Sequence, residues 1–185
     1  MKRTLTTLPL LLAALAVAAP ARAETALTPF VGLAFGGRAD DSKVTYGGAI
    51  GFYGDGAGLG FEVDFGYTPE FFPGGARLRE SNVTTLMGNL LFVASGGSAR
   101  FYLAGGLGLL KTRVSDVDGF FDVDSNDFGF DVGGGLEFAL SDRLGLRGDL
   151  RYFRALTDPE PDDEFDIDLA DLDFFRATVG LSLKL

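Results

Sequence analysis

Regular alternation of large apolar residues with small or charged ones is the feature that most constrains how this chain can fold. In the segment GLGFEVDFGY, residues 58–67, apolar side chains occupy the odd positions, whereas Gly60, Glu62, Asp64 and Gly66 occupy even ones. Because successive side chains of an extended strand point to opposite faces, this segment has one apolar face and one polar face. A soluble sheet with one wet face and a transmembrane barrel with a polar lumen can both use such a strand.

Alternating segments of this kind recur along the whole chain and predict eight strands. Short connections, such as GDGAG, SGGSA and the turn around SDR, alternate with long or polar ones, such as GRADDSK and TDPEPDDEFDIDLAD. An even number of strands, joined by short turns at one end and longer loops at the other, is typical of bacterial outer-membrane barrels. We therefore predict an all-β fold, an eight-stranded antiparallel up-and-down transmembrane β-barrel. Its expected strands are residues 27–37, 43–53, 58–68, 83–94, 100–113, 127–140, 143–156 and 173–185.

The start of the chain has the features of a cleaved export signal. The basic residues Lys2 and Arg3 precede an almost wholly apolar stretch at residues 8–19. The small residues Ala21 and Ala23 then form an A-x-A cleavage site. The apolar stretch is shorter than a membrane-spanning helix requires. We therefore expect two parts, a signal peptide at residues 1–23 and an outer-membrane β-barrel at residues 24–185.

Composition narrows the possible functions. The chain contains no Cys and no His, which argues against disulfides, thiolate metal sites and mechanisms that need an imidazole base. Its formal net charge of −10 makes binding to nucleic acid through phosphates unfavourable. The segment DVDSNDFG, residues 122–129, resembles a calcium-binding loop but has Asp127 where an EF-hand needs Gly. We predict no enzymatic activity, no cofactor, no metal site and no nucleic-acid partner.

Barrel volume decides which face of each strand points inward. An eight-stranded barrel is only just wide enough for side chains to fill it, so several Phe and Leu residues per strand would overfill the lumen. Small residues with a few ionised ones fit that space, and ionised groups there need partners or water. We therefore place the apolar face against lipid and predict an ionic network in the lumen, with Glu137 directly across from Arg147. For any single member, the alternative is a hydrated position near a mouth of the lumen. The predicted members are Glu62, Asp64, Asn89, Asp131, Glu137, Arg147, Asp149, Arg151, Arg176 and Lys184.

Two of the expected loops are strongly acidic. Residues 114–127 hold five Asp, and residues 157–171 hold eight Asp or Glu. Such runs are typical of solvated surface segments, and weak binding of divalent cations is the alternative that their charge allows. The expected loops also carry aromatic residues, which fit either a girdle at the membrane interface or an adhesive tip. These aromatic residues are Phe71, Phe72, Phe120 and Phe121.

These patterns resemble the small outer-membrane β-barrel family that includes OmpX-like and OmpA-type barrels. The resemblance rests on LTPFVGLAFGG near the start, the central NLLFVASGGSARFYLAGGLGLL, the paired segments FGFDVGGGLEFAL and LGLRGDLRYF, and TVGLSLKL at the end. The last segment is similar to the family's C-terminal assembly signal, which usually ends in an aromatic residue where this chain has Leu185. The resemblance implies recognition by the outer-membrane assembly machinery through Thr178, Gly180, Leu183 and Leu185, and an interior charge network.

Taken together, the sequence predicts a non-enzymatic protein of the cell outer membrane, which the chain reaches after export to the periplasm. We expect it to act in envelope integrity or surface interaction, as a monomer in contact with outer-membrane lipid and lipopolysaccharide. Surface or host ligands would meet its loops. The alternative is a narrow porin-like channel for water, ions or small solutes. A soluble ligand-binding barrel is a third interpretation, which a periplasmic location would favour.

Overall fold

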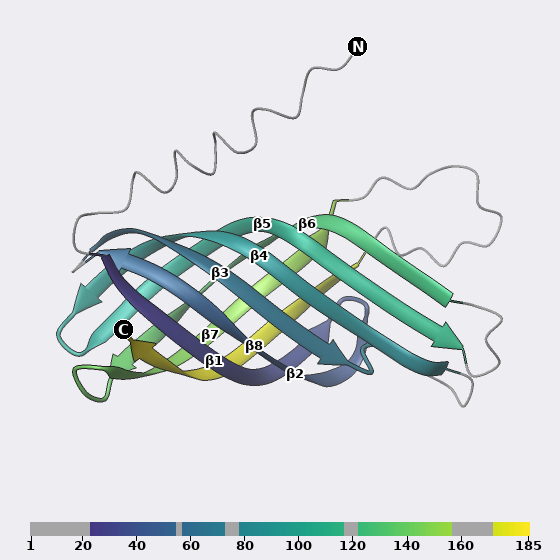
Figure 1. Cartoon of the computed structure of the whole chain (residues 1–185), viewed down its shortest axis with the longest axis horizontal. Coiled ribbons are helices and arrows are strands. Elements are labelled where there is room, and N and C mark those ends of the chain that lie inside the picture. Colours follow the sequence, from purple (N-terminus) through teal and green to yellow (C-terminus); the bar gives the residue numbers. More distant parts are fainter. Residues whose placement is uncertain (1–22, 55–56, 73–77, 117–121, 157–171) are drawn as a thin grey trace, which may run out of the picture.

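The eight expected strands all form, and they close into one antiparallel barrel (Figure 1). The computed structural model describes residues 23–54, 57–72, 78–116, 122–156 and 172–185. The expected signal peptide, including Ala21, therefore lies outside them except for its last residue, Ala23, which begins β1. Each strand pairs with the next one along the chain, and β1 pairs with β8 to close the barrel. The strands are β1 Ala23–Gly36, β2 Ala39–Gly54, β3 Gly58–Pro69, β4 Leu78–Gly96, β5 Ala99–Asp116, β6 Asp122–Ala139, β7 Leu144–Ala155 and β8 Asp173–Lys184.

The two ends of the barrel differ. One end, here called the terminal end, holds the start of β1, the end of β8 and the connections after β2, β4 and β6 (Figure 1). The other end, called the loop end, holds the remaining connections. The β1–β2 connection, expected to include all of GRADDSK, is a tight turn in which Gly36 pairs with Ala39. Gly36 and Gly37 have φ angles of 70° and 58°, which glycine adopts without strain. Strand β2 therefore begins at Ala39, earlier than expected.

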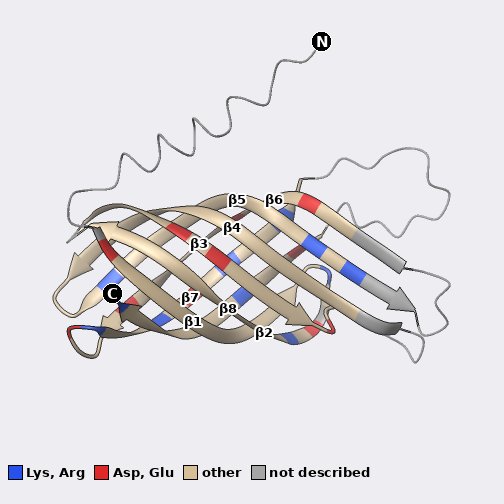
Figure 2. Ribbon diagram, viewed as in Figure 1, with Lys and Arg blue, Asp and Glu red and all other residues tan. Residues whose placement is uncertain are grey.

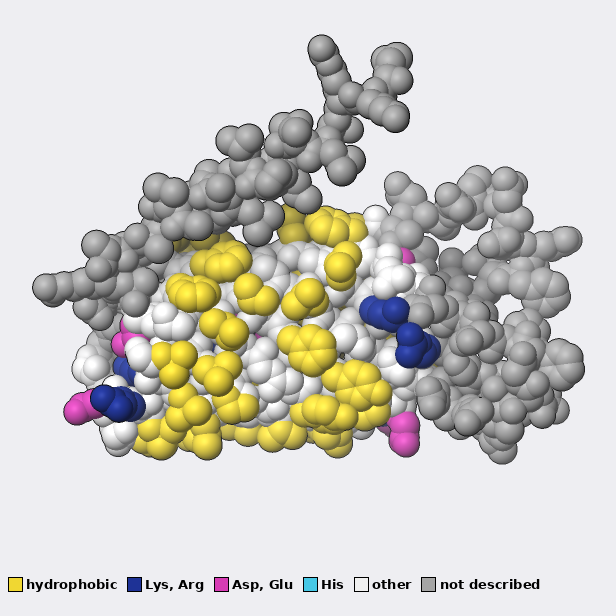
Figure 3. All heavy atoms as spheres, in the orientation of Figure 1, with side chains coloured by type: hydrophobic (Ala, Val, Ile, Leu, Met, Phe, Trp, Pro, Cys, Tyr) yellow, Lys and Arg dark blue, Asp and Glu magenta, His cyan; other side chains and the backbone are white. Residues whose placement is uncertain are grey.

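Burial in this barrel is the reverse of burial in a soluble protein. Phe92 and Leu103 are 60% and 67% exposed on the outside, whereas Glu62 and Arg151 are 0% and 1% exposed. Figure 3 shows apolar side chains spread over the outer surface of the strands. Buried and exposed residues alternate along β3, so the polar face of GLGFEVDFGY points into the barrel. An outer surface of this kind suits contact with lipid.

The closing strand β8 carries the residues of the expected assembly signal. Leu183 and Leu185 are exposed on the outside, Thr178 is half-buried, and Gly180 is buried against β1. A Cβ atom on Gly180 would lie 2.6 Å from the backbone oxygen of Pro29, so only glycine allows the two strands this approach. The pattern thus lies on the strand that closes the barrel, and its recognition by assembly machinery stays a prediction.

Candidate functional site

Charged side chains from strands far apart in the sequence converge inside the barrel. Figure 2 shows acidic positions midway along β3 and basic positions on the strands behind it. Two guanidinium groups and three carboxylates are joined to one another by ion pairs, and a third guanidinium–carboxylate pair lies beside them. All of these groups are buried or nearly so. We call this set, with its amide and two tyrosines, the central cluster. Its members are Tyr53, Glu62, Asp64, Asn89, Tyr102, Asp131, Arg147, Asp149, Arg151 and Arg176.

Arg147 on β7 connects strands on opposite sides of the lumen. Its Nη1 and Nη2 donate to the two carboxylate oxygens of Glu62 on β3, the second at 3.2 Å. Its Nε donates at 2.6 Å to the hydroxyl of Tyr102, which donates in turn to Asp149 at 2.6 Å. The guanidinium carbon also lies 4.4 Å from the centroid of the Tyr102 ring. Two-pronged pairing and contact with an aromatic face are the arrangements that satisfy a desolvated guanidinium best.

Arg151, also on β7, joins three carboxylates. Its Nε and Nη2 donate to the two oxygens of Asp149 at 2.9 and 3.1 Å, and Nη2 also donates to Glu62 at 2.6 Å. Its Nη1 donates to Asp131 on β6 at 3.1 Å. The amide of Asn89 on β4 completes this group, since its nitrogen donates to Asp131 at 2.6 Å and its oxygen accepts from Arg151 at 2.8 Å. These contacts link β3, β4, β6 and β7 across the lumen.

Arg176 on β8 forms the edge of the central cluster nearest the loop end. Its Nη2 donates to Asp64 at 2.7 Å. Its guanidinium carbon lies over two aromatic rings, 4.9 Å from the centroid of Phe30 and 4.6 Å from that of Phe153. Arg176 therefore joins the charged cluster to the apolar side chains that follow it in the lumen.

Glycines on the inward face provide the room that these long side chains occupy. A Cβ atom on Gly66 would lie 2.3 Å from Nη1 of Arg176, and one on Gly106 would lie 2.1 Å from the side-chain amide of Asn89. A side chain at either position would displace a member of the cluster. The high glycine content of the chain, 27 of 185 residues, thus reflects in part the narrowness of an eight-stranded lumen.

A second ionic group lies at the mouth of the lumen at the terminal end. Arg100 pairs with Glu24 at 3.2 Å and with Glu137 at 3.4 Å, and Lys184 pairs with Glu24 at 3.3 Å. Lys184, predicted as a member of the lumen network, takes the alternative position near a mouth of the lumen, where its side chain is 20% exposed and pairs with Glu24. Glu137 does lie across from Arg147 in the strand register, as expected, yet its ion pair is with Arg100.

Four members of these two groups were not identified from the sequence. Arg100 and Tyr102 share the inward face of β5, where they alternate with exposed Phe101, and this alternation could have revealed them. Tyr53 is likewise the inward neighbour of exposed Phe52 on β2. Glu24 directly follows the expected cleavage site and precedes the first expected strand, so strand alternation could not reveal it.

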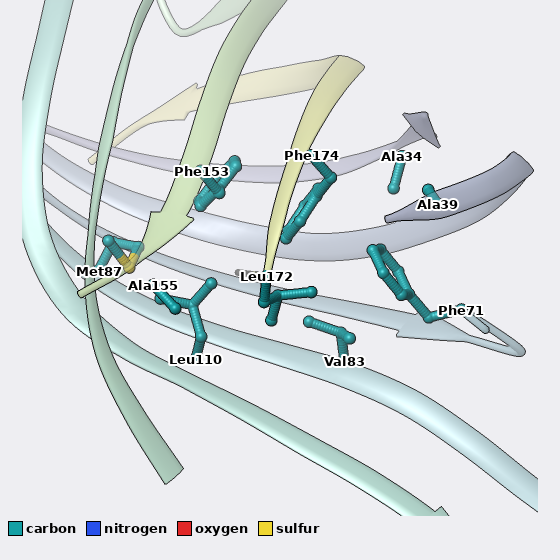
Figure 4. Close-up of a cluster of buried hydrophobic side chains, with 10 residues drawn as sticks. All are labelled: Ala34, Ala39, Phe71, Val83, Met87, Leu110, Phe153, Ala155, Leu172 and Phe174. Atoms are coloured by element: carbon teal, nitrogen blue, oxygen red, sulfur yellow. The ribbon is translucent and has the colours of Figure 1, made fainter. Parts of the chain in front are cut away.

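Beyond the central cluster, the lumen is filled by an apolar layer near the loop end (Figure 4). The rings of Phe153 and Phe174 stack with centroids 5.0 Å apart, and Phe71 contacts Phe174 edge-on at 5.1 Å. Strand alternation predicts apolar side chains on the outer face, so this layer inside the lumen was not expected. Its members are Ala34, Ala39, Phe71, Val83, Met87, Leu110, Phe153, Ala155, Leu172 and Phe174.

Both expectations for Phe71, a membrane-interface girdle and an adhesive tip, are wrong. Phe71 follows β3, is 0% exposed and packs inside the apolar layer. Its backbone nitrogen donates to the carbonyl oxygen of Ser81, which holds this segment against the start of β4. Phe72 is partly buried and packs against the same layer. Phe120 and Phe121 lie outside the described residues.

The lumen contains a small cavity beside the charged side chains. It is lined by residues including Thr28, Asp64, Arg147 and Thr178, and it has room for about one water molecule. Within the described ranges no three Asp or Glu side chains are grouped in a way that could hold a metal ion. The carboxylates of the central cluster instead face guanidinium groups. The arrangement is suited to holding the strands together and blocking the lumen.

An apolar outer belt around a closed barrel with a charged interior defines a transmembrane β-barrel of the bacterial outer-membrane type. In the part of the chain that the structure describes, no helix is long and apolar enough to cross a membrane. The chain matches the family model of the outer membrane protein beta-barrel domain over residues 8–184, and it belongs to that family. It is therefore a protein of the outer membrane. The match begins inside the expected signal peptide, whose cleavage stays a prediction.

Solved structures of small outer-membrane barrels share this fold. Neisserial surface protein A has a TM-score of 0.64 at 14% identity, with 87% of this chain and 97% of that chain covered. Ail, the attachment invasion locus protein of Yersinia pestis, has a TM-score of 0.59 at 13% identity, covering 89% and 99%. The outer membrane enzyme PagL has a TM-score of 0.52 at 14% identity, covering 86% and 99%. No curated protein sequence gives a significant match to this chain.

Proposed function

We propose that this protein is a non-enzymatic outer-membrane barrel with a closed lumen, which supports the envelope and carries loops that make contacts outside the cell. The observation that carries the proposal is the pair of barriers in series inside the barrel. The central cluster forms one barrier, and the apolar layer between it and the loop end forms the other.

Each barrier resists the passage of ions for a different reason. Opening the central cluster would separate buried ion pairs, and a buried charge that loses its partner costs about 3–5 kcal/mol. The apolar layer offers ions no polar groups, and narrow apolar constrictions exclude water. The cross-strand ion pairs also fix the strands relative to one another, which favours a rigid support for loops.

The chemistry of the lumen supports a role other than catalysis. Glu62, Asp131 and Asp149 accept hydrogen bonds from arginines, so none of them is presented to a substrate. The chain also lacks His, the most common general base. The likeness to the outer membrane enzyme PagL extends to the fold alone, at 14% identity.

Two of the structural neighbours bear names that favour a role at the cell surface. Neisserial surface protein A is named for its location, and Ail was crystallised with the heparin analogue sucrose octasulfate. In this chain, residues 157–171 include eight acidic residues. Sulfated ligands are negatively charged, so these residues would repel them. We therefore propose contacts with cationic groups or with bound divalent ions for this segment.

The channel alternative is tested by osmotic shrinkage of vesicles that contain the refolded protein. We expect water, urea and glycerol to cross these vesicles at the rate of protein-free vesicles, because two barriers close the lumen. Faster shrinkage with the wild-type protein would favour the channel instead. Electrophoresis of unheated samples verifies that the barrel is folded and inserted.

The surface role is tested in a Gram-negative strain that lacks the protein. The strain is complemented with the wild-type chain or with a variant in which the eight acidic residues of 157–171 become Asn or Gln. We expect the variant to insert normally and restore resistance to detergent, while losing binding to cationic surfaces. Equal binding by both chains would contradict the proposed role of these loops.

A further inference from the structure

The charges of the central cluster do not balance. It contains three guanidinium groups and four carboxylates, those of Glu62, Asp64, Asp131 and Asp149. With every group ionised, the central cluster therefore has a net charge of −1. The second ionic group, at the terminal end, has two acids and two bases, so it supplies no spare positive charge. A net charge inside a narrow lumen is costly unless an opposite charge lies beside it.

The small cavity in the lumen is lined by oxygen-bearing side chains from four strands. Asp64 on β3 and Asp149 on β7 contribute carboxylates, and Thr28 on β1 and Thr178 on β8 contribute hydroxyls. Gly180 on β8 keeps this space open, because a Cβ atom there would lie 3.1 Å from Cγ2 of Thr28. The lining thus offers both charged and neutral oxygen atoms to a ligand about the size of one water molecule.

The hydroxyl of Thr28 indicates that this cavity takes a ligand. Thr28 is 2% exposed, and its Oγ1 has no hydrogen-bond partner among the residues that the structure describes. Buried hydroxyl groups in native proteins nearly always have a partner. Because Thr28 lines the cavity, a molecule or ion bound there would supply the missing contact.

We propose that this cavity binds one monovalent cation, sodium or potassium, which neutralises the central cluster. Hard cations take oxygen ligands, and the lining provides them. Water alone would satisfy Thr28 but would leave the net charge of −1, and an anion would increase it. A divalent metal is disfavoured, because within the described ranges no three acidic side chains are grouped to hold one.

Two arginines also line the cavity, and they do not exclude a cation. Arg147 donates to Glu62 and Arg151 donates to Asp149, so each guanidinium charge is already matched by a carboxylate. The excess of one carboxylate remains after these pairs are counted. The bound cation would act as a structural ligand that holds β1, β3, β7 and β8 together, a role beyond the proposed contacts of the loops.

The test is urea unfolding of the full barrel refolded in sodium, potassium or N-methyl-D-glucamine chloride at one ionic strength. Refolding in each salt lets the ion enter before the lumen closes. A cation that binds only the folded barrel stabilises it by mass action. A tenfold rise in sodium or potassium should therefore lower the unfolding equilibrium constant by up to about tenfold. N-methyl-D-glucamine is far larger than a water molecule and should give no such change.

Three variants separate coordination from charge. Thr28→Val keeps the shape of the side chain and removes its hydroxyl, so the dependence on sodium or potassium should be lost, whereas Thr28→Ser should retain it. Asp131→Asn removes the excess negative charge at a position outside the cavity lining, so it should also abolish the dependence. Gel mobility verifies that each variant is folded.

Thr112→Val is the matched control. Thr112 is also fully buried with an unpartnered hydroxyl, but it lies on β5 in register with Val83 of the apolar layer. This variant should keep the full dependence on sodium or potassium.

Several results would overturn the proposal. Equal stability in all three salts would do so, as would a cation dependence that persists in Thr28→Val or Asp131→Asn, or that is lost in Thr112→Val. Stability that varies with pH but not with the cation would show that a proton on a carboxylate neutralises the cluster instead. A change on replacing chloride with gluconate at constant sodium would show an anion bound to the guanidinium groups.

Discussion

Replacing Arg151 with Met tests how strongly the central cluster stabilises the barrel. Arg151 is 1% exposed and donates hydrogen bonds to Asp149, Glu62 and Asp131. Methionine replaces the aliphatic stem of arginine and carries no charge. The change therefore removes the ionic contacts of the guanidinium while keeping the packing of the stem.

The expected magnitude follows from which partners remain. Glu62 keeps its pairing with Arg147, and Asp149 keeps the hydroxyl of Tyr102. Asp131 keeps the hydrogen bond from the Asn89 amide, so it is the carboxylate left with least compensation. We expect Arg151→Met to lower the free energy of unfolding by about 3–5 kcal/mol, the usual cost of stranding a buried charge.

The assay is urea unfolding of the refolded protein in detergent micelles, followed by circular dichroism and by gel mobility, with linear extrapolation to water. Adding Asp131→Asn to Arg151→Met should recover at least about 1 kcal/mol, because the stranded charge is removed. Lys184→Met is the matched control, since its partly exposed ion pair contributes about 0–1 kcal/mol. An Arg151→Met protein as stable as the Lys184→Met protein would refute the reasoning.

Two further substitutions test the packing and the hydrogen bonds of the lumen. Gly66→Ala should destabilise the barrel by about 1–3 kcal/mol in the same urea assay, because the added Cβ would meet Arg176. In the control Gly148→Ala the Cβ meets nothing, so the free energy of unfolding should change by no more than about 0.5 kcal/mol. Equal effects would contradict the tight fit. Tyr102→Phe should lower the free energy of unfolding by about 1–3 kcal/mol, because it removes the hydroxyl between Arg147 and Asp149. The control Tyr152→Phe, at an outward-facing position, should lower it by less than about 1 kcal/mol. A neutral Tyr102→Phe would show that this hydroxyl contributes no net stability.

The fold could be predicted from the sequence because strand alternation has a period of two and recurs in every strand. Once one face is assigned to lipid, each charged residue on the other face is placed in the lumen, as Glu62 and Arg147 are. Strand ends were predicted less well. GRADDSK is mostly polar, and polarity alone did not distinguish an open loop from a tight turn in which Gly36 pairs with Ala39.

The partners within the lumen could not be predicted from alternation alone. Alternation fixes the face of a residue, but its partners depend on strand tilt and stagger around the whole barrel. Glu137 lies across from Arg147 in register, yet it pairs with Arg100 from the strand on its other side. The apolar layer was missed for a related reason. Phe153 continues the inward face of Arg151, but the volume argument alone does not show that a few aromatic rings fit into the lumen beyond the charged residues.

The central claim, a lumen closed by two barriers in series, is tested most directly by single-channel conductance in a planar bilayer. Four refolded proteins are compared: the wild type, Arg147→Ala/Arg151→Ala in the central cluster, Phe153→Ser/Phe174→Ser in the apolar layer, and the combination of all four changes. Gel mobility verifies that each one is folded. The account predicts that the first three proteins are silent, because at least one barrier remains, and that the combined variant opens steadily. Steady openings in the wild type, or in either variant with one barrier intact, would contradict it.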